Sequence, residues 1–210
     1  MNIIIFGPPG AGKGTQSNFL KEDLKMTQIS TGDLLRNELK KETELSKQIR
    51  NIIDSGKLVS DKIIYDLIED KISNKNIENM MIFDGFPRNI EQAKNLEIML
   101  KKHDQHLSKV LNLKVDYSIL IKRISGRVLC PVCKNTFNEY FDPPPQKCRE
   151  NKLIKRSDDN EGTVKKRLEI YDKETLPLLE YYKNQNKVLN IDAMKQIDEV
   201  RKEIRGVLKG

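Results

Sequence analysis

Short apolar runs alternate with longer segments of helical periodicity along the chain. The apolar runs lie at residues 2–6, 28–30, 80–85, 109–115 and 187–191. Runs of this length that break into turn formers are typical of buried strands. Apolar residues recur every three or four positions at 13–24, 34–41, 44–56 (with Gly56 as a C-terminal stop), 61–72, 90–103 and 162–183. Strands that alternate with helices indicate βαβ units, so the sequence predicts an α/β fold with a parallel sheet.

Residues 126–159 interrupt this alternation. The segment holds all three cysteines, a run of three prolines at 143–145 and several turn formers, and it has no helical period. A non-periodic stretch of this length is uncommon inside a compact domain and is usually functional. We therefore expect a small separate module here, such as an active-site lid.

Composition limits the possible partners and locations. The chain of 210 residues has no apolar run near the ~20 residues that a membrane span needs. Residues 3–6 are too short an apolar stretch for a secretory signal, so we expect a cytoplasmic location and no membrane partner. The net charge of +7 favours acidic partners such as nucleotides or nucleic acid. The basic residues are mixed with acidic ones, however, which also fits a solvated lysine-rich surface and argues against a nucleic-acid stripe.

The segment GPPGAGKGT at 7–15 has the pattern of a phosphate-binding loop. It follows the first predicted strand and opens the first predicted helix, which is the context such a loop requires. Its four glycines allow backbone N–H groups to close on phosphate oxygens, and Lys13 can reach the outer phosphates. The usual pattern has Ser or Thr directly after the lysine. Here Gly14 stands in that place, and the hydroxyl follows one residue later at Thr15.

Two further segments carry candidate ligand-binding groups. Asp84 ends a predicted buried strand, where ligands collect in doubly wound folds, and could hold Mg²⁺ through water or simply form a turn. The following turn, GFPR, could present Arg88 to an anion. In STGDLLR at 30–36, Thr31 and Arg36 could contact a ligand, although Ser30 or Thr31 could equally serve as a helix cap.

Together these motifs resemble the adenylate kinase family over essentially the whole chain. They stand, in the family's order, as GPPGAGKGT at 7–15, STGDLLR at 30–36, GKLV at 56–59, DGFPR and its glutamine at 84–92, R-x-x-G-R at 123–127 and R-x-D-D-N-x-x-T-V-x-x-R-L at 156–168. A glycine after the lysine is characteristic of this family. The resemblance implies reversible phosphoryl transfer from MgATP to AMP, giving two ADP, with a role in adenine nucleotide homeostasis. A UMP/CMP kinase is the alternative within the same class, against which Thr31 and the long cysteine-bearing lid argue.

The resemblance also implies how the chain is divided. A doubly wound core with a phosphate loop and a five-stranded parallel sheet would comprise residues 1–29, 60–125 and 160–210. A helical AMP-binding insertion would span 30–59, and the lid would span 126–159. The family is usually monomeric, so we expect a monomer. Both insertions would move, because closing over the substrates excludes water from the transferring group.

Site residues follow from the same resemblance. ATP would contact Gly10, Ala11, Gly12, Lys13, Gly14, Thr15, Arg123, Arg127, Thr136, Phe137 and the segment at Lys195. AMP would contact Thr31, Arg36, Lys57, Leu58, Val59, Gly85, Phe86, Pro87, Arg88, Gln92, Arg156 and Arg167. The catalytic set would be Lys13, Arg88, Arg123, Arg156 and Arg167, with Mg²⁺ held through water by Asp84 and also by Asp33. The segment at Lys195 departs from the D-G-x-K form common in the family.

The lid cysteines predict a metal site of unusual composition. Cys130, Cys133 and Cys148 match the zinc-bearing, long-lid branch of the family, whose fourth ligand is Cys or Asp three residues after the third cysteine. Asn151 stands there instead, and a neutral amide is a poor ligand for Zn²⁺. Zinc could be held by three thiolates with Glu150, Asn151 or water, or the site could have lost its metal. A nucleic-acid-binding zinc ribbon is the alternative from another class, but basic and aromatic residues gathered on one surface are not evident.

Overall fold

A five-stranded parallel sheet forms the centre of the molecule. The computed structural model describes residues 1–41, 43–54, 59–77, 79–133 and 135–209. Within these residues the central strands follow the order β2-β3-β1-β4-β7, and every neighbouring pair is parallel. The strands are β1 (Asn2–Phe6), β2 (Thr27–Ser30), β3 (Met81–Asp84), β4 (Leu107–Lys114) and β7 (Val188–Asp192). The predicted α/β fold with a five-stranded parallel sheet is therefore confirmed.

Helices cover both faces of this sheet, and strand β1 shows how the sequence arranges them. Ile3 and Ile5 pack in one apolar cluster with residues of α1 (Lys13–Leu24) and α10 (Ile197–Lys209). Ile4 and Phe6 point to the opposite face and pack in a second cluster with residues of α4 (Asp61–Ile72), α5 (Ile90–Lys102) and α9 (Leu178–Lys183). Because successive strand residues face opposite sides, a strand buried on both faces must be apolar throughout.

The remaining elements of the core connect these layers. They are α6 (Leu120–Ser125), α8 (Glu161–Ile170), the π-helix η4 (Tyr171–Thr175) and the short 3-10 helices η2 (Lys75–Ile77) and η3 (Tyr117–Ile119). The segment 162–183, predicted as one helical stretch, is thus divided among α8, η4 and α9, and this corrects the prediction. The division has a local cause, because Leu176 N bonds Tyr171 O in the wider π pattern and Pro177 follows without an N–H to continue an α-helix.

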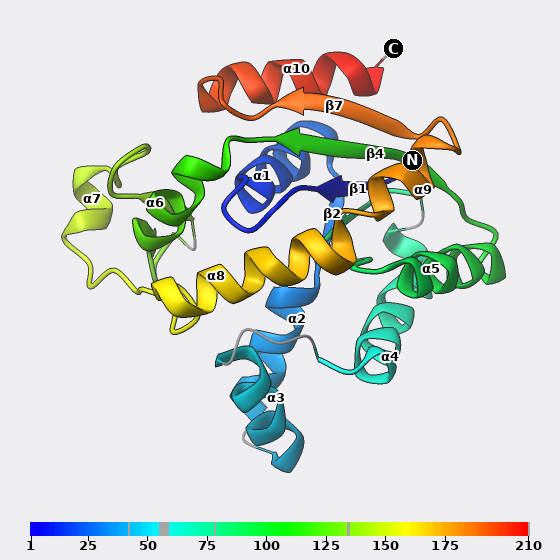
Figure 1. Ribbon diagram of the computed structural model, residues 1–210, viewed down its shortest axis with the longest axis horizontal. Coiled ribbons are helices and arrows are strands. Elements are labelled where there is room, and N and C mark those ends of the chain that lie inside the picture. Colours follow the sequence, from blue (N-terminus) through cyan, green and yellow to red (C-terminus); the bar gives the residue numbers. More distant parts are fainter. Residues whose placement is uncertain (42, 55–58, 78, 134, 210) are drawn as a thin grey trace.

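Two segments extend from the core on different sides (Figure 1). One contains α2 (Thr31–Glu38), the 3-10 helix η1 (Leu39–Lys41) and α3 (Glu44–Asp54), and it projects away from the sheet. The predicted stop of this region at Gly56 lies outside the described residues. The other is the lid segment 126–159, which stands at the end toward which β4 points.

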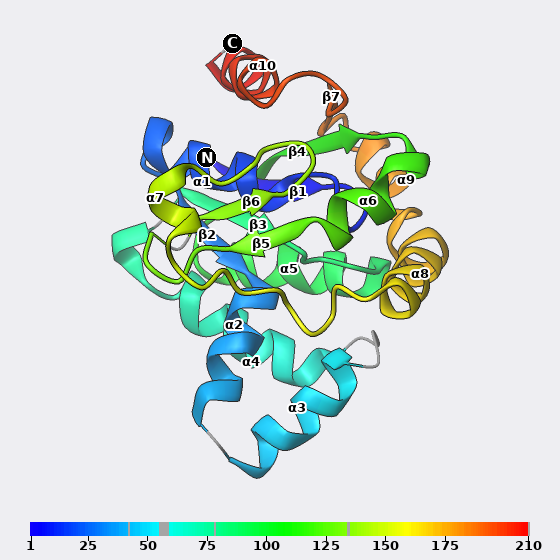
Figure 2. The ribbon, with the colours of Figure 1, turned by 90° about the vertical axis from the view of Figure 1, so that its left-hand side faces the viewer.

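The lid segment has a small framework of its own (Figure 2). Strands β5 (Arg127–Leu129) and β6 (Thr136–Asn138) pair in antiparallel register, and the helix α7 (Gln146–Arg149) packs beside them. The sequence predicted no helix in this segment. A helix of four residues is too short to show a period, which explains the omission. In the part of the chain that is described, no helix is long and apolar enough to cross a membrane.

Candidate functional site

The described residues enclose a cleft of about 1260 Å³ at the carboxyl ends of β1 and β3. Its walls come from the loop after β1, from α2, from the turn after β3, from α8 and from the lid segment. Every predicted nucleotide-site residue that is described lines this cleft, whereas Lys57 and Leu58 lie outside the described residues. The residues brought together are Gly10, Ala11, Gly12, Lys13, Gly14, Thr15, Thr31, Arg36, Val59, Asp84, Gly85, Phe86, Pro87, Arg88, Gln92, Arg123, Arg127, Thr136, Phe137, Arg156, Arg167 and Lys195.

The phosphate loop, residues 7–15, wraps around the start of α1. Gly10 and Gly12 adopt φ values of 85° and 93°, which glycine tolerates best. A Cβ at Gly10 would lie 3.0 Å from Ile124 Cγ1, so the loop also lacks room there for a side chain. Lys13 Nζ donates to Gly7 O at 2.7 Å and to Pro8 O at 3.0 Å. The loop thus places an ammonium group and the positive end of α1 in the cleft.

Lys13 is partly buried close to other positively charged side chains. Burial lowers the pKa of Lys13 to about 8, and the positive charges of Arg167 and Arg88 add to this shift, while Asp84 opposes it. An anion bound beside Lys13 would offset the repulsion and favour the charged ammonium. The position of Lys13 therefore favours a negatively charged ligand.

Asp84 is the last residue of β3 and lines the cleft together with the phosphate loop. Gln28 Nε2 donates to Asp84 Oδ2 at 2.9 Å. Burial raises the pKa of Asp84, whereas Lys13 and the hydrogen bond from Gln28 lower it. A carboxylate that is directed into a cleft and has one oxygen held by an amide has the donor chemistry that Mg²⁺ and its water shell use.

The turn after β3 is fixed to α2 and α5 by hydrogen bonds. Gly85 O accepts from Thr31 Oγ1 at 2.9 Å and from Arg88 Nε at 2.8 Å. Gly85 has a φ of 75°, and a Cβ on it would lie 3.1 Å from Thr31 Oγ1. Gln92 Oε1 accepts from Arg88 N at 2.7 Å, and Gln92 Nε2 donates to Asp61 Oδ1 at 2.6 Å. This network fixes the direction in which the Arg88 guanidinium faces the cleft.

In the segment STGDLLR at 30–36, the structure shows which residue caps the helix. Ser30 is the helix cap, because its side chain accepts from Asp33 N at 3.3 Å. Thr31 is buried and uses its hydroxyl to hold Gly85 O, 54 positions away in the chain. Arg36 pairs with Asp33 at 2.6 Å along the helix surface.

Positive charge dominates the cleft. Among the described lining residues, ten are Lys or Arg and four are acidic, all of them Asp. Burial lowers the pKa of both Arg88 and Arg156 to about 10, and neighbouring arginines add to both shifts. Two acidic residues of the lid segment balance part of this charge: Asp159 accepts two hydrogen bonds from Arg127, and Asp158 pairs with Arg167 at 3.2 Å. The arrangement suits a polyanionic ligand.

The residues that the sequence predicts to contact ATP beyond the phosphate loop lie in the lid segment, in α6 and in the segment at Lys195. Thr136 and Phe137 belong to β6. Arg123 Nη2 donates to Ala193 O at 3.0 Å, and its guanidinium carbon lies 5.7 Å from the centre of the Phe141 ring. The side chain of Lys195 pairs with Glu203 at 2.7 Å, and Lys195 lines the cleft together with its neighbours Met194 and Gln196.

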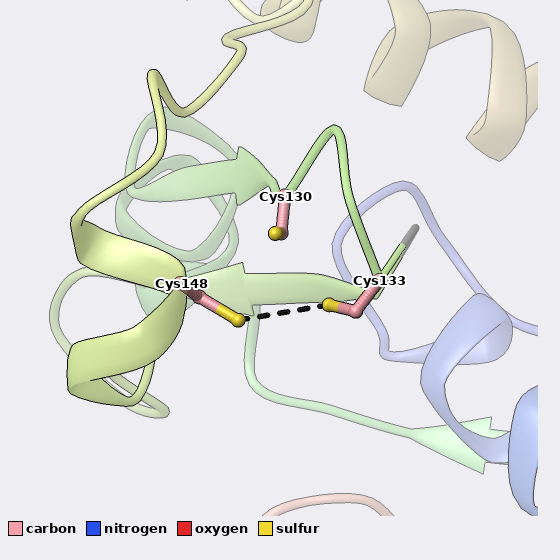
Figure 3. A group of neighbouring side chains, drawn as sticks. All are labelled: Cys130, Cys133 and Cys148. Atoms are coloured by element: carbon pink, nitrogen blue, oxygen red, sulfur yellow. Dashed lines mark hydrogen bonds between the residues drawn. The ribbon is translucent and has the colours of Figure 1, made fainter.

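The three lid cysteines form a cluster outside the lining of the cleft (Figure 3). Their sulfur atoms all lie within 4.8 Å of one another, and Cys133 Sγ is 3.6 Å from Cys148 Sγ. Cys130 and Cys148 are buried, whereas Cys133 is exposed. Backbone N–H groups of Cys133 and Val132 lower the pKa of Cys130 to about 7, and burial raises the pKa of Cys148 to about 11. The spacing is compatible with Zn²⁺, since zinc–sulfur bonds of about 2.3 Å place tetrahedral ligands about 3.8 Å apart.

A fourth protein ligand of the usual kind is not found in the described chain. No His, Asp or Glu of the described residues joins the three sulfur atoms. Asn151 Nδ2 donates to Lys147 O at 2.8 Å, which engages this amide with the last turn of α7. The predicted three-cysteine set is thus brought together, and the fourth ligand stays a prediction.

Comparisons with known proteins decide the family. The family model described as adenylate kinase matches residues 5–187. The adenylate kinase of Methanocella arvoryzae is 41% identical and aligns with 100% of this chain and 99% of its own length. Those of Pelagibacter ubique and Clostridioides difficile are each 42% identical and aligned over 98% or more of both chains. The chain belongs to the adenylate kinase family.

Family membership confirms the resemblance and the adenylate kinase activity that it implied. The named relatives are adenylate kinases, which favours this activity over the UMP/CMP kinase alternative. The cysteine cluster also places the chain with the long-lid members of the adenylate kinase family, as predicted.

Several residues that line the cleft were not found from the sequence. Arg50 enters it from α3, and Tyr140 and Phe141 enter it from the lid segment as exposed aromatic side chains. Met194 adds a further exposed apolar side chain. The only sequence signal for the two aromatic residues was their place in a non-periodic, polar segment, and Arg50 resembles any charged residue on a helix surface.

Proposed function

We propose that the chain catalyses the reversible transfer of the γ-phosphoryl group of MgATP to AMP, giving two ADP, and so maintains adenine nucleotide balance. The main support for this proposal is that the phosphate loop and the turn at 84–88 line one cleft that is rich in lysine and arginine. The attacking oxygen of an AMP phosphate is already anionic near pH 7, so the reaction needs no general base. Catalysis then depends on alignment and on stabilising the charge of the transferring group.

On the donor side, the N–H groups of the phosphate loop bind the ATP phosphates. Lys13 exchanges its bonds to Gly7 O and Pro8 O for phosphate oxygens and follows the transferring group. Arg123 and Arg127 neutralise further charge from the lid side. Thr136 and Phe137 contact the adenine and ribose, together with the backbone at Lys195.

On the acceptor side, Arg36 and Arg88 hold the AMP phosphate with their planar forks. Arg156 and Arg167 lie between the two nucleotides and bring their phosphates together against mutual repulsion. The adenine of AMP is read by Thr31, Gln92 and the segment that includes Val59 and Gly85.

Asp84, together with Asp33, is the group that would hold Mg²⁺ through water. The ion, when bound, neutralises charge on the ATP phosphates and helps to align them. Gln28 keeps the Asp84 carboxylate oriented, since it holds Oδ2 at 2.9 Å. Thr15, one place after Gly14, adds its hydroxyl at the start of α1.

Two insertions would close over the substrates and exclude water, which competes with AMP for the phosphoryl group. We assign these roles to residues 30–59 and 126–159, with residues 1–29, 60–125 and 160–210 as the core. We further propose that the protein acts as a monomer in the cytoplasm.

A coupled assay with AMP, CMP and UMP as acceptors tests the function. We expect turnover with AMP and little with the pyrimidine nucleotides. Turnover with UMP or CMP equal to that with AMP would contradict the proposed acceptor.

We expect Arg50→Ala to raise the KM for AMP by roughly two- to tenfold, with little change in the KM for ATP. Arg50 is exposed on α3 and lines the cleft, and within the described residues it forms no ion pair. Its charge is therefore available to a nucleotide on the acceptor side. The matched control is Lys47→Ala on the same helix, whose side chain pairs with Glu44 outside the lining. An equal effect of both substitutions on the KM for AMP would contradict a specific role of Arg50.

The cysteine cluster would hold Zn²⁺ through Cys130, Cys133 and Cys148, with an incomplete fourth position. Asn151→Cys should then tighten zinc binding by roughly tenfold or more, because a fourth thiolate completes a closed structural site. Competition with a chromophoric chelator measures the change. Lys152→Cys, which adds a thiol one residue farther along, should give no gain. Equal zinc affinity of the Asn151→Cys protein and the native protein would support a lid held by packing and hydrogen bonds alone.

A further inference from the structure

Two sulfur atoms of the lid cluster lie nearly in contact and come from separate elements (Figure 3). Cys133 belongs to the loop after β5 and Cys148 to α7, and their sulfur atoms point toward each other across 3.6 Å. A disulfide bond is about 2.05 Å long, so closing it requires a shift of about 1.5 Å, shared between two side chains. We propose that Cys133 and Cys148 are a peroxide-sensitive thiol pair that forms a reversible disulfide and cross-links the lid.

The exposure of the three thiols explains why this pair reacts. Cys133 is exposed, so a small oxidant in solution can reach it, whereas Cys130 and Cys148 are buried. The initial oxidation therefore takes place at Cys133, whose Sγ lies 3.6 Å from Cys148 Sγ. Cys130 Sγ lies to one side of this pair and accepts from the backbone N–H groups of Val132 and Cys133. These bonds hold its sulfur in the loop.

The chemistry balances with hydrogen peroxide as the oxidant. The Cys133 thiolate attacks one peroxide oxygen, the O–O bond breaks, and the sulfur becomes a sulfenic acid as hydroxide leaves and takes up a proton to form water. Cys148 Sγ then attacks Cys133 Sγ, the S–O bond breaks, and a second water leaves as the S–S bond forms. Two thiols are oxidised by two electrons in total, and one peroxide is reduced to two waters.

The disulfide would cross-link a part of the fold that has little regular secondary structure. The lid segment is built on two paired strands of three residues each and on a four-residue helix. A bond from Cys133 to Cys148 encloses β6 and the prolines at 143–145, and so restricts the opened forms of this segment. A metal ion bound by the same thiols would have a similar effect, so the two cross-links exclude each other.

Thiol mapping of the full chain tests the proposal. The protein is freed of metal with a chelator, treated with hydrogen peroxide, alkylated, and digested without reduction for mass spectrometry. We expect two of the three thiols to be lost, a peptide linked through Cys133 and Cys148, and recovery of all three thiols after dithiothreitol. Three free thiols, a Cys130–Cys133 link or a sulfinic acid at Cys133 would each overturn the proposal.

Two variants and limited proteolysis extend the test. Cys130→Ser should still form the disulfide, because the 3.6 Å pair remains. Oxidation should slow protease cleavage within 126–159 by about fivefold or more in the native chain and in Cys130→Ser. Cys133→Ser should show no such protection. Loss of the link in Cys130→Ser, or equal cleavage rates before and after oxidation of the native chain, would contradict the assigned pair.

Discussion

Lys13→Ala should lower the turnover number by about 10²–10³-fold or more while leaving the fold intact. Lys13 Nζ lies on the phosphate loop, between Gly7 O and Pro8 O, and faces a cleft that collects positive charge. In the proposed reaction it is the cation that stays with the phosphoryl group during transfer. The coupled assay measures turnover, and far-UV circular dichroism with thermal melting checks the fold.

Two further variants separate charge from structure. Lys13→Met keeps most of the apolar stem and removes only the ammonium group, so we expect a loss of turnover similar to that of Lys13→Ala. Lys165→Ala removes a lysine that pairs with Glu161 on the exposed side of α8, outside the lining of the cleft, and should leave turnover nearly unchanged. Near-normal turnover of Lys13→Met would show that residues 7–15 are not the donor phosphate site.

Much of the fold could be predicted because it rests on local patterns. The all-apolar run at 2–6 predicted a strand buried on both faces, and α1 and α4 have the predicted bounds. The break near Pro177 was missed, because a π-helical turn keeps apolar residues at nearly helical spacing. The C-terminal helix α10 was also not predicted, although Val200 and Ile204 lie one turn apart in the core.

The sequence predicts a part of the candidate site well only where the residues of that part are consecutive in the chain. The phosphate loop is such a segment, since its glycines, lysine and helix start are consecutive in the chain. The hydrogen bond from Thr31 to Gly85 joins residues 54 positions apart, and no local pattern announces it. Arg50 and Phe141 enter the cleft only because α3 and the lid segment fold toward it. Contacts between distant segments therefore determine which further residues line the cleft, and the sequence motifs do not show them.

Arg88→Lys should raise the KM for AMP by roughly tenfold to a hundredfold, with little change in the KM for ATP. Arg88 Nε is held by Gly85 O at 2.8 Å, which leaves the rest of the fork to bind a phosphate. A lysine keeps a charge but can neither hold this carbonyl nor present two parallel N–H groups. Steady-state kinetics with each nucleotide varied in turn distinguish the two KM values.

Arg88→Lys should also make the KM for AMP depend on pH, and the residues around position 88 determine whether this KM rises or falls with pH. Burial and the charge of Arg167 lower the pKa of Arg88 to about 10, and an arginine there stays charged at neutral pH. A lysine starts from a lower pKa and meets the same two effects, so it loses its proton earlier as pH rises. The KM for AMP of Arg88→Lys should therefore increase from pH 7 to pH 9 more steeply than that of the native chain.

Arg205→Lys is the matched control and should change neither KM. Arg205 is an exposed arginine that pairs with Asp23 outside the cleft lining. A selective loss on the ATP side, or a KM for AMP that falls as pH rises, would place Arg88 away from the acceptor phosphate.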